Sequence, residues 1–336
     1  MRNKIHFFSL PLIVFATISI LIIAISCEKN YARDYKDQIT KTFRVNEGQL
    51  FYLKSDMGSV EVDSWNRDEV KIIVIKKAKT YSKREAERVY DDLELRFDQN
   101  RRGVSVIAEY TGPKRWSRRK LSVHFEILVP KKFDLDISTA GGSISVEDLE
   151  GKIDLHTSGG SITIGRIEGP VNARTSGGSI KVTKAKGDVD VHTSGGSISI
   201  GETSGSLDAE TSGGSINLDG VDGDTYVHTS GGSLKLKNLA GNVQGSTSGG
   251  GIYAELTGKI DRDCYLKTSG GSITIYLLSN INAEIDAHTS SGRVSTDFPV
   301  TVRGKLKSNS LYGKINDGGP LIKLRTSGGG IRIKEF

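Results

Sequence analysis

The sequence predicts an all-β fold: a single-stranded parallel β-solenoid of the β-helix or β-roll kind, with 18-residue coils and a small N-terminal capping region that contains one helix. Three observations predict it. A short motif recurs at a fixed interval, apolar and polar residues alternate within each repeat, and many of the 40 glycines among the 336 residues fall at fixed places in the repeat. Self-similarity at a short fixed period is the signature of a repeat architecture.

The motif Thr-Ser-Gly-Gly marks each repeat. It begins at Thr157, Thr175, Thr193, Thr211, Thr229, Thr247, Thr268 and Thr326, and the variants TAGG and TSSG begin at Thr139 and Thr289. From Thr139 to Thr247 the interval is 18 residues without exception, and the next two intervals are 21 residues. We therefore place a repeat region at residues 139–336.

Each repeat contains two short stretches with the pattern of a strand. If the threonine is position 1, apolar side chains occupy positions 6 and 8 and again positions 15 and 17; in the repeat from Thr193 these are Ile198, Ile200, Leu207 and Ala209. Such alternation is typical of a strand with one buried face. Glycines at positions 4 and 13 predict corners, because glycine tolerates positive φ and a close approach of backbone. The threonine ladder shares the inward parity, so we expect it to be structural.

The first 26 residues form an export segment. A short positive start precedes an apolar run, which is typical of a secretory signal peptide or a single membrane anchor. The run ends in Ala24-Ile25-Ser26 directly before Cys27, which resembles the lipobox of bacterial lipoproteins, in which the cysteine thiol is acylated. We therefore expect residues 1–26 to be removed and Cys27 to carry lipid. An uncleaved transmembrane helix and a freely secreted chain are the alternatives, and all three place the rest of the chain outside the cytoplasm.

The segment before the repeats has a different pattern. We expect residues 27–40 to be a tether and residues 41–138 to form an N-terminal cap with irregular first coils. Ser82 begins the run SKREAERVYDDL, whose helix formers and capping serine predict one helix. Such a cap would shield an open sheet edge from end-to-end pairing. Strands are predicted near residues 50–53, 59–62, 70–75, 104–110 and 121–128.

Two runs carry a family resemblance: FEILVPKKFDLDISTAGGSISVEDLEGKIDLHTSGGSI at residues 125–162 and MGSVEVDSWNRDEVKI at residues 57–72. They resemble bacterial envelope proteins of the family called domain of unknown function 4097, or "putative adhesin". The similarity covers about residues 40–336. The resemblance implies a β-solenoid located in the cell envelope, and it implies no biochemical activity and no functional residues.

Composition and charge exclude several classes of protein. The 46 basic and 40 acidic residues give a net charge of +6, far from the dense basic stripe of a nucleic-acid binder. Two cysteines exclude a disulfide framework. If Cys27 is lipidated, Cys264 is left alone, and we expect it to be an inert, small apolar side chain. We expect no cofactor, and the sequence does not indicate an oligomeric state.

Outward Asp and His side chains at positions 16 and 18 are the first candidates for chemistry. They include Asp154, His156, Asp190, His192 and Asp208. A metal site is disfavoured because His156 and His192 lie two coils apart, about 10 Å at strand spacing, which is too far for one zinc ion. The SGGSI corners lack the acidic ligands that calcium needs. We therefore predict no metal-binding and no catalytic residues, and we interpret this face as solvated surface.

A basic loop is the sharpest local feature outside the repeats. Five cations around a tryptophan suit an anionic surface, such as lipid headgroups, lipopolysaccharide or an acidic glycan. The alternative is a solvated hairpin tip. The loop residues are Lys114, Arg115, Trp116, Arg118, Arg119 and Lys120.

The sequence thus predicts a non-enzymatic protein of the bacterial cell envelope. It would be exported and held at the membrane through a lipid or a helix, as a periplasmic or surface-exposed lipoprotein. There it would act as an adhesin or surface scaffold that presents a repetitive polar surface to a glycan or another envelope protein. Two alternatives are a carbohydrate-active β-helix enzyme and an accessory or sensor protein of an envelope signalling system. A carboxylate cluster in a groove built by residues 258–325 would favour the enzyme.

Overall fold

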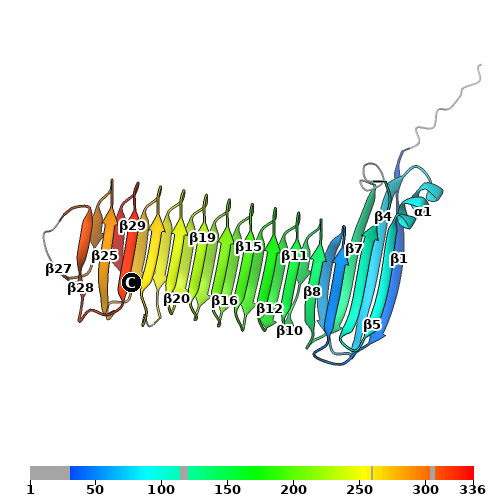
Figure 1. Cartoon of the computed structure of the whole chain (residues 1–336), viewed down its shortest axis with the longest axis horizontal. Helices are drawn as coiled ribbons and strands as arrows, with labels where there is room; N and C mark the ends of the chain where they lie inside the picture. Colours follow the sequence, from blue (N-terminus) through cyan, green and yellow to red (C-terminus); the bar gives the residue numbers. More distant parts are fainter. Residues whose placement is uncertain (1–30, 114–119, 259, 303–306) are drawn as a thin grey trace, which may run out of the picture.

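The chain forms a rod made of two β-sheets whose strands run across its length (Figure 1). The computed structural model describes residues 31–113, 120–258, 260–302 and 307–336. Within these residues each sheet has 15 strands, and the only helix is α1 (Lys83–Asp91). At a strand spacing of about 4.8 Å, a stack of 15 strands is roughly 65 Å long.

The regular repeats contribute alternately to the two sheets. Sheet A contains β12 (Ile162–Glu168), β14 (Ile180–Ala185), β16 (Ile198–Thr203), β18 (Ile216–Val221), β20 (Leu234–Leu239) and β22 (Ile252–Leu256). Sheet B contains β11 (Ile153–Thr157), β13 (Val171–Thr175), β15 (Val189–Thr193), β17 (Leu207–Thr211), β19 (Thr225–Thr229) and β21 (Val243–Thr247). Neighbouring strands within a sheet are parallel. Ile162 pairs with Ile180 in sheet A, and Ile153 pairs with Val171 in sheet B, so the register advances by one repeat in both sheets.

The hydrophobic core lies between the two sheets. The first inward position of the sheet A strands is at most 2% exposed at Ile144, Ile162, Ile180, Ile198, Ile216, Leu234 and Ile252. Sheet B contributes matching buried columns, which include Val189 and Leu207. Burying one such side chain contributes about 1.5–3 kcal/mol before chain entropy is deducted. The inward assignment is confirmed, as are the all-β class, the long parallel strands and, within the described ranges, the single helix.

The threonine of each TSGG motif joins one coil to the coil before it. Thr193 is fully buried, and its hydroxyl donates to the carbonyl oxygen of Gly178 at 2.7 Å and accepts from the backbone N–H of Gly196 at 3.4 Å. Each hydroxyl therefore satisfies two backbone groups that a buried corner would otherwise leave unpaired. The same two contacts recur at Thr157, Thr175, Thr211, Thr229 and Thr247.

The second glycine of the motif is required by close packing and not by backbone conformation. A Cβ atom on Gly160 would lie 2.0 Å from the carbonyl oxygen of Gly142 in the preceding coil, although φ at Gly160 is not positive. Positive φ, which the sequence analysis expected at the corners, occurs at position 13 in Gly151, Gly169 and Gly241. Close approach of the backbone of the neighbouring coil is therefore a more general reason for glycine at these corners than a positive φ.

The N-terminal part contains longer strands than the repeats. Their bounds are β1 (Arg33–Arg44), β2 (Leu50–Ser55), β3 (Ser59–Trp65), β4 (Glu69–Thr80), β5 (Leu93–Asn100), β6 (Gly103–Tyr110), β7 (Leu121–Pro130), β8 (Asp134–Thr139), β9 (Ile144–Val146) and β10 (Leu149–Glu150). The five predicted strands and the predicted helix are present. β1 and β5 were not predicted, because charged and exposed side chains hide their strand pattern. β1 also occupies part of residues 27–40, which the sequence analysis assigned to a tether.

The first coil is inserted out of sequence order. β2 pairs in parallel with β8 on one side and β6 on the other, and β3 lies in the same way between β9 and β7. Beyond these strands the pairing becomes antiparallel: β4 and β1 close sheet A, and β5 closes sheet B. The edge strand β1 is lined with charged side chains, which discourages pairing with another chain.

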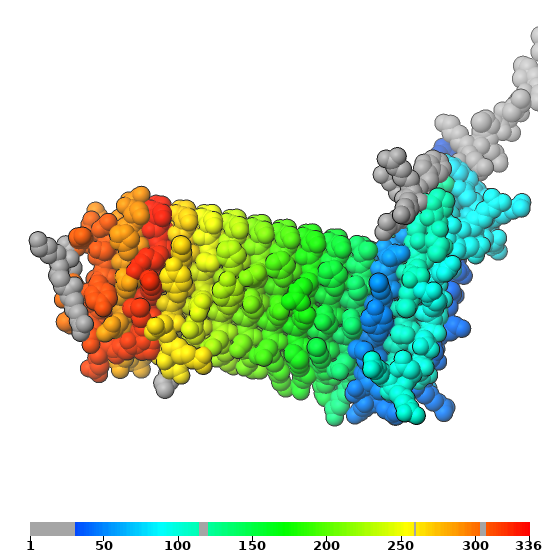
Figure 2. Space-filling model, viewed as in Figure 1, coloured from blue at the N-terminus to red at the C-terminus, as the bar shows by residue number. Residues whose placement is uncertain are grey.

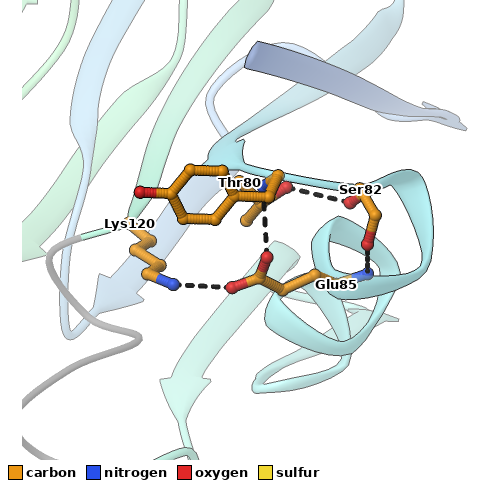
Figure 3. A network of polar contacts seen from close by, with 5 residues as sticks. Thr80, Ser82, Glu85 and Lys120 are labelled. Atoms are coloured by element: carbon orange, nitrogen blue, oxygen red, sulfur yellow. Dashed lines mark hydrogen bonds and ion pairs between the residues drawn. The ribbon is translucent and has the colours of Figure 1, made fainter. Parts of the chain in front are cut away.

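A variant of the capping box, in which the glutamate reaches the residue before the N-cap, fixes the start of α1 (Figure 3). The Ser82 hydroxyl accepts from the N–H of Glu85 at 3.2 Å, and the Glu85 carboxylate accepts from the N–H of Tyr81 at 3.1 Å. The same carboxylate pairs with Lys120 at 2.6 Å, and this hydrogen bond is the main cause that lowers the pKa of Glu85. Its stabilising effect is therefore present while Glu85 is ionised and is lost as the pH falls through that lowered pKa.

The C-terminal end shows a second out-of-order insertion. β29 pairs in parallel with both β23 and β25, and β30 pairs with both β24 and β26, so the chain end lies inside the stack (red in Figure 1). β28 and β27 then close sheet B with antiparallel pairing. Figure 2 shows the resulting continuous surface, on which successive coils form parallel ribs. The strands are β23 (Cys264–Thr268), β24 (Ile273–Leu277), β25 (Ala283–Thr289), β26 (Val294–Thr296), β27 (Val300–Val302), β28 (Ser310–Ile315), β29 (Leu321–Thr326) and β30 (Ile331–Glu335).

We expect Gly160→Ala to destabilise the rod and its neighbour Gly159→Ala to be nearly neutral. A Cβ atom at Gly160 would meet backbone at 2.0 Å, whereas nothing lies within 4 Å of a Cβ atom at Gly159. Overpacking costs about 1–3 kcal/mol or more, while a compatible Gly to Ala change stabilises by about 0.4–1 kcal/mol through the unfolded chain. Denaturant unfolding of both variants measures the difference, and equal midpoints would contradict the close-packing argument.

Candidate interaction surfaces

Outward side chains give the rod two long faces with different chemistry. On sheet B they form two parallel columns across β11–β21. A groove of about 500 Å³ runs along this face, and its polar lining includes Asp190, Asp208 and Tyr226. The first column contains Asp154, Asn172, Asp190, Asp208 and Tyr226, and the second contains His156, Arg174, His192, Glu210 and His228.

Burial and neighbouring carboxylates raise the pKa of two carboxyl groups on this face, Asp208 and Asp136. Asp190 lies opposite Asp208 on the adjacent strand. Partial burial, followed by the charges of Glu210 and Asp190, raises the pKa of Asp208. In the same way burial and the charge of Asp154 raise the pKa of Asp136. Because the folded state disfavours the ionised form of these two carboxyls, their contribution to stability is greatest at low pH and is lost as the pH rises.

An arginine and a histidine contact carboxylates on this face. Arg174 contacts Asp190 at 2.7 Å, and His192 lies 3.6 Å from Glu210. His156 and His192 both lie opposite Arg174, one on each side of it, so they are two strands apart as the repeat spacing predicted. Across the described ranges no group of three or more His, Cys, Asp or Glu side chains is placed to hold a metal ion.

Four aspartates at the corners have structural partners. Each accepts the backbone N–H of the residue one repeat later and so ties adjacent coils together. The sequence analysis missed this role. The sequence does contain a signal for it, because each of these aspartates lies one repeat before the residue whose N–H it accepts. The pairs are Asp134 with Lys152, Asp148 with Arg166, Asp188 with Ser206 and Asp224 with Asn242, at 2.8, 2.9, 2.8 and 3.2 Å.

The outer face of sheet A is basic and aromatic. Lys181, Lys235 and Lys237 point outward from β14 and β20. Two hollows of about 380 and 600 Å³ adjoin on this face, since Lys235 and Lys237 line both of them. Tyr253 lines the second hollow. The sequence analysis did not single out this face, because Lys181 and Lys235 lie three repeats apart in the sequence.

A further hollow of about 470 Å³ lies near the C-terminal end of the rod. It is formed by residues between Leu256 and Pro320, which is the segment where a carboxylate cluster would favour an enzyme. The described residues that line it are apolar, amide, hydroxyl or glycine residues, and none carries a carboxylate. The polar side chains that line it are Thr257, Asn280 and Asn282.

The predicted lipidation and surface-contact residues fall mostly outside the described residues. This applies to Cys27 and to all of residues 114–119, which include Lys114, Arg115, Trp116, Arg118 and Arg119. Lys120, at the end of the basic loop, is described and pairs with Glu85. In the part of the chain that the structure describes, no helix is both long enough and apolar enough to span a bilayer.

Cys264 is a buried free thiol on β23, as the expectation of an inert side chain requires. Burial is the main cause that raises its pKa to about 11. The thiolate is the reactive form of cysteine, so this raised pKa removes most of the reactivity near neutral pH.

Comparison with protein families places the whole rod in one of them. The model of the Toastrack DUF4097 family matches residues 52–334, which run from β2 into β30. The chain belongs to this family. The match confirms the resemblance seen in residues 57–72 and 125–162, and it includes both out-of-order coils of this Toastrack chain.

Solved structures resemble this Toastrack chain at low identity. A "putative cell adhesion protein" from Clostridium sporogenes is 14% identical, with 90% of this chain and 100% of that chain covered and a TM-score of 0.23. A "putative adhesin" from Parabacteroides merdae is 12% identical, with 89% and 96% covered and a TM-score of 0.40. A "putative lipid binding protein" from Parabacteroides distasonis is 12% identical, with 89% and 97% covered and a TM-score of 0.34. These scores are too low to support an argument about function. No curated protein matches the chain.

We expect Cys264 to resist alkylation by iodoacetamide at pH 8 in the folded protein and to react fully after unfolding in guanidinium chloride. The reason is that a thiol with a pKa of about 11 is almost entirely protonated at that pH and is shielded by sheet B. Mass spectrometry of the Cys264 peptide measures the fraction alkylated. Rapid modification of the folded chain would show that β23 does not bury this side chain.

Proposed function

We propose that this protein is a non-enzymatic scaffold or adhesin of the bacterial cell envelope, built as a β-solenoid with 18-residue coils. The observation that carries the proposal is the uninterrupted stack of parallel strands from β8 to β24, whose outward side chains repeat at one spacing on two faces. A partner that is held at one contact meets the next contact at high effective concentration, so repeated faces suit binding by many weak contacts.

The contacts between coils support a mechanical role. Every coil is hydrogen-bonded to its neighbours through both of its strands, through a buried threonine and, at several corners, through an aspartate. In such an array each coil contacts only its neighbours, and the sum of many equal interfaces holds the rod straight. A rod of this kind would keep a surface at a fixed distance from the point where the chain is attached.

The attachment that we propose is a lipid on Cys27. The apolar run before it would direct export, and acylation after removal of residues 1–26 would leave the rod at the membrane surface. β1 begins at Arg33, so only residues 28–32 would separate the lipidated cysteine from the first strand. The N-terminal end of the rod would then lie next to the membrane, and the C-terminal end would point away from it.

We expect mass spectrometry of the mature protein from bacterial membranes to find a diacylglyceryl group on an N-terminal Cys27. An intact segment 1–26 on that protein would contradict lipid attachment.

The adhesive role is tested on the same purified chain with a glycan array and with isolated envelope fractions. We expect retention of the ligand with its mass unchanged. Release of shortened glycan would identify an enzyme and contradict the proposal.

The basic loop is proposed as a second contact with the anionic membrane. We expect part of the binding of the full chain to phosphatidylglycerol vesicles to be salt-sensitive, and Arg115→Ala/Arg118→Ala/Arg119→Ala to remove most of that salt-sensitive part, because headgroup attraction amounts to about 1 kcal/mol per basic residue. Vesicle co-sedimentation measures this. Unchanged binding by the triple variant would leave the loop as a solvated hairpin tip.

A further inference from the structure

We infer that the outer face of sheet A binds an acidic polysaccharide along the axis of the rod. The binding face consists of Lys181, Lys235, Lys237 and Tyr253 around the two adjoining hollows. The inference names a ligand class for one face of the proposed scaffold. The inference rests on the proposed function in one respect only, since the protein must be exported to meet a polysaccharide outside the cell. Binding measured with the purified chain does not depend on where the protein is located.

The lysines of this face are not neutralised by the protein. Among the described residues, no carboxylate lies within 4.0 Å of the amines of Lys181, Lys235 or Lys237. By contrast, Lys184, at the end of β14, is paired with Glu202 on the next strand. Cations that line a hollow and have no ionic partner in the protein attract an anion.

The net charge of the face is positive over its whole C-terminal half. The exposed or half-buried residues of its strands from β14 to β30 include six cations and four carboxylates, which gives a net charge of +2. Three of the carboxylates have partners: Glu202 pairs with Lys184, Asp219 accepts from the Asn238 amide at 3.0 Å, and Glu255 accepts from the Tyr253 hydroxyl. The cations are Lys181, Lys184, Lys235, Lys237, Arg332 and Lys334.

Between the lysines lie small and polar residues that can form hydrogen bonds. Ser199, Gly201 and Asn217 lie between Lys181 and Lys235 and line the first hollow. Small side chains leave the backbone and its neighbouring hydroxyl and amide groups open to a ligand. From β14 to β22 there are four strand steps, about 19 Å at strand spacing. A surface of this length fits a polymer better than a single small molecule.

Aromatic residues continue the face beyond the lysines. The rings of Tyr253 and Tyr276 lie 5.4 Å apart, those of Tyr276 and Phe336 lie 5.6 Å apart, and the Lys334 amine lies 5.8 Å from the Tyr276 ring. The hydrogen bond to Glu255 raises the pKa of Tyr253 to about 12, so this hydroxyl stays protonated. Aromatic rings beside a few directed polar groups are typical of sites for sugars, whose C–H faces pack against the ring.

These features favour a polysaccharide over a lipid surface. A membrane-binding face would project large apolar side chains into the bilayer interface. The exposed large apolar residues in the described part of the chain are Tyr31, Tyr81, Tyr226, Tyr312 and Phe336. Of these only Phe336, at the chain end, adjoins this face, and Lys181, Lys235 and Lys237 are set around hollows.

The test uses the full chain, purified from membranes in mild detergent, with polygalacturonate as the acidic probe and dextran as the neutral one. We expect polygalacturonate binding that weakens with added salt, and little binding of dextran. Lys181→Ala/Lys235→Ala/Lys237→Ala should weaken polygalacturonate binding by about tenfold or more, which is about 1.4 kcal/mol. Tyr253→Ala should weaken it further than Tyr253→Phe, because phenylalanine keeps the ring.

The matched control removes the same charge from the opposite face. Lys152→Ala/Lys267→Ala/Lys323→Ala alters sheet B and should change the affinity by less than about threefold. Equal losses in the two triple variants, both folded by circular dichroism, would overturn the inference, as would equal binding of dextran or no binding of polygalacturonate. If the sheet A variant lost binding to phosphatidylglycerol vesicles and kept its binding to polygalacturonate, the inference would be overturned in favour of a lipid surface. Failure to find a lipid on Cys27 would leave this test untouched.

Discussion

The buried threonine at each corner is the interaction on which the rest of the rod depends. Its hydroxyl reaches a glycine carbonyl in the preceding coil at 2.6–2.8 Å, and the coils can come this close only because the facing residue has no Cβ atom. The hydrogen bond and the glycine are therefore coupled requirements. Together they fix the register between coils, and a fixed register is what aligns the aliphatic columns inside and the charged columns outside.

The repeat region could be predicted closely because one repeated sequence pattern determines both its strand register and its buried face. The period gave the register, the alternation gave the buried face, and both follow from local sequence. The ends were harder. β1 and β5 have charged residues where a half-buried strand would have apolar ones, and the pairing of β29 between β23 and β25 depends on contacts distant in sequence. The basic face was missed for a related reason, since Lys181 and Lys235 lie three repeats apart and meet only in the folded stack.

The two faces show how one scaffold can carry opposite charges. Sheet B places carboxylates on adjacent strands, where burial and mutual repulsion raise the pKa of Asp208, while sheet A places unpaired lysines beside tyrosines. Inward positions are constrained by packing, whereas outward positions are free to vary without loss of the core. Chemistry in this fold can therefore change one face at a time.

At both ends of the regular stack the next strands are inserted out of sequence order, β2 and β3 at one end and β29 and β30 at the other. Neither end of the regular stack offers a simple place for growth, because β8 already pairs with β2 and β24 already pairs with β30. The central units are interchangeable, so an in-frame duplication or loss of one unit would lengthen or shorten the rod and leave both closures untouched. The length of the rod is therefore set by the count of its middle units.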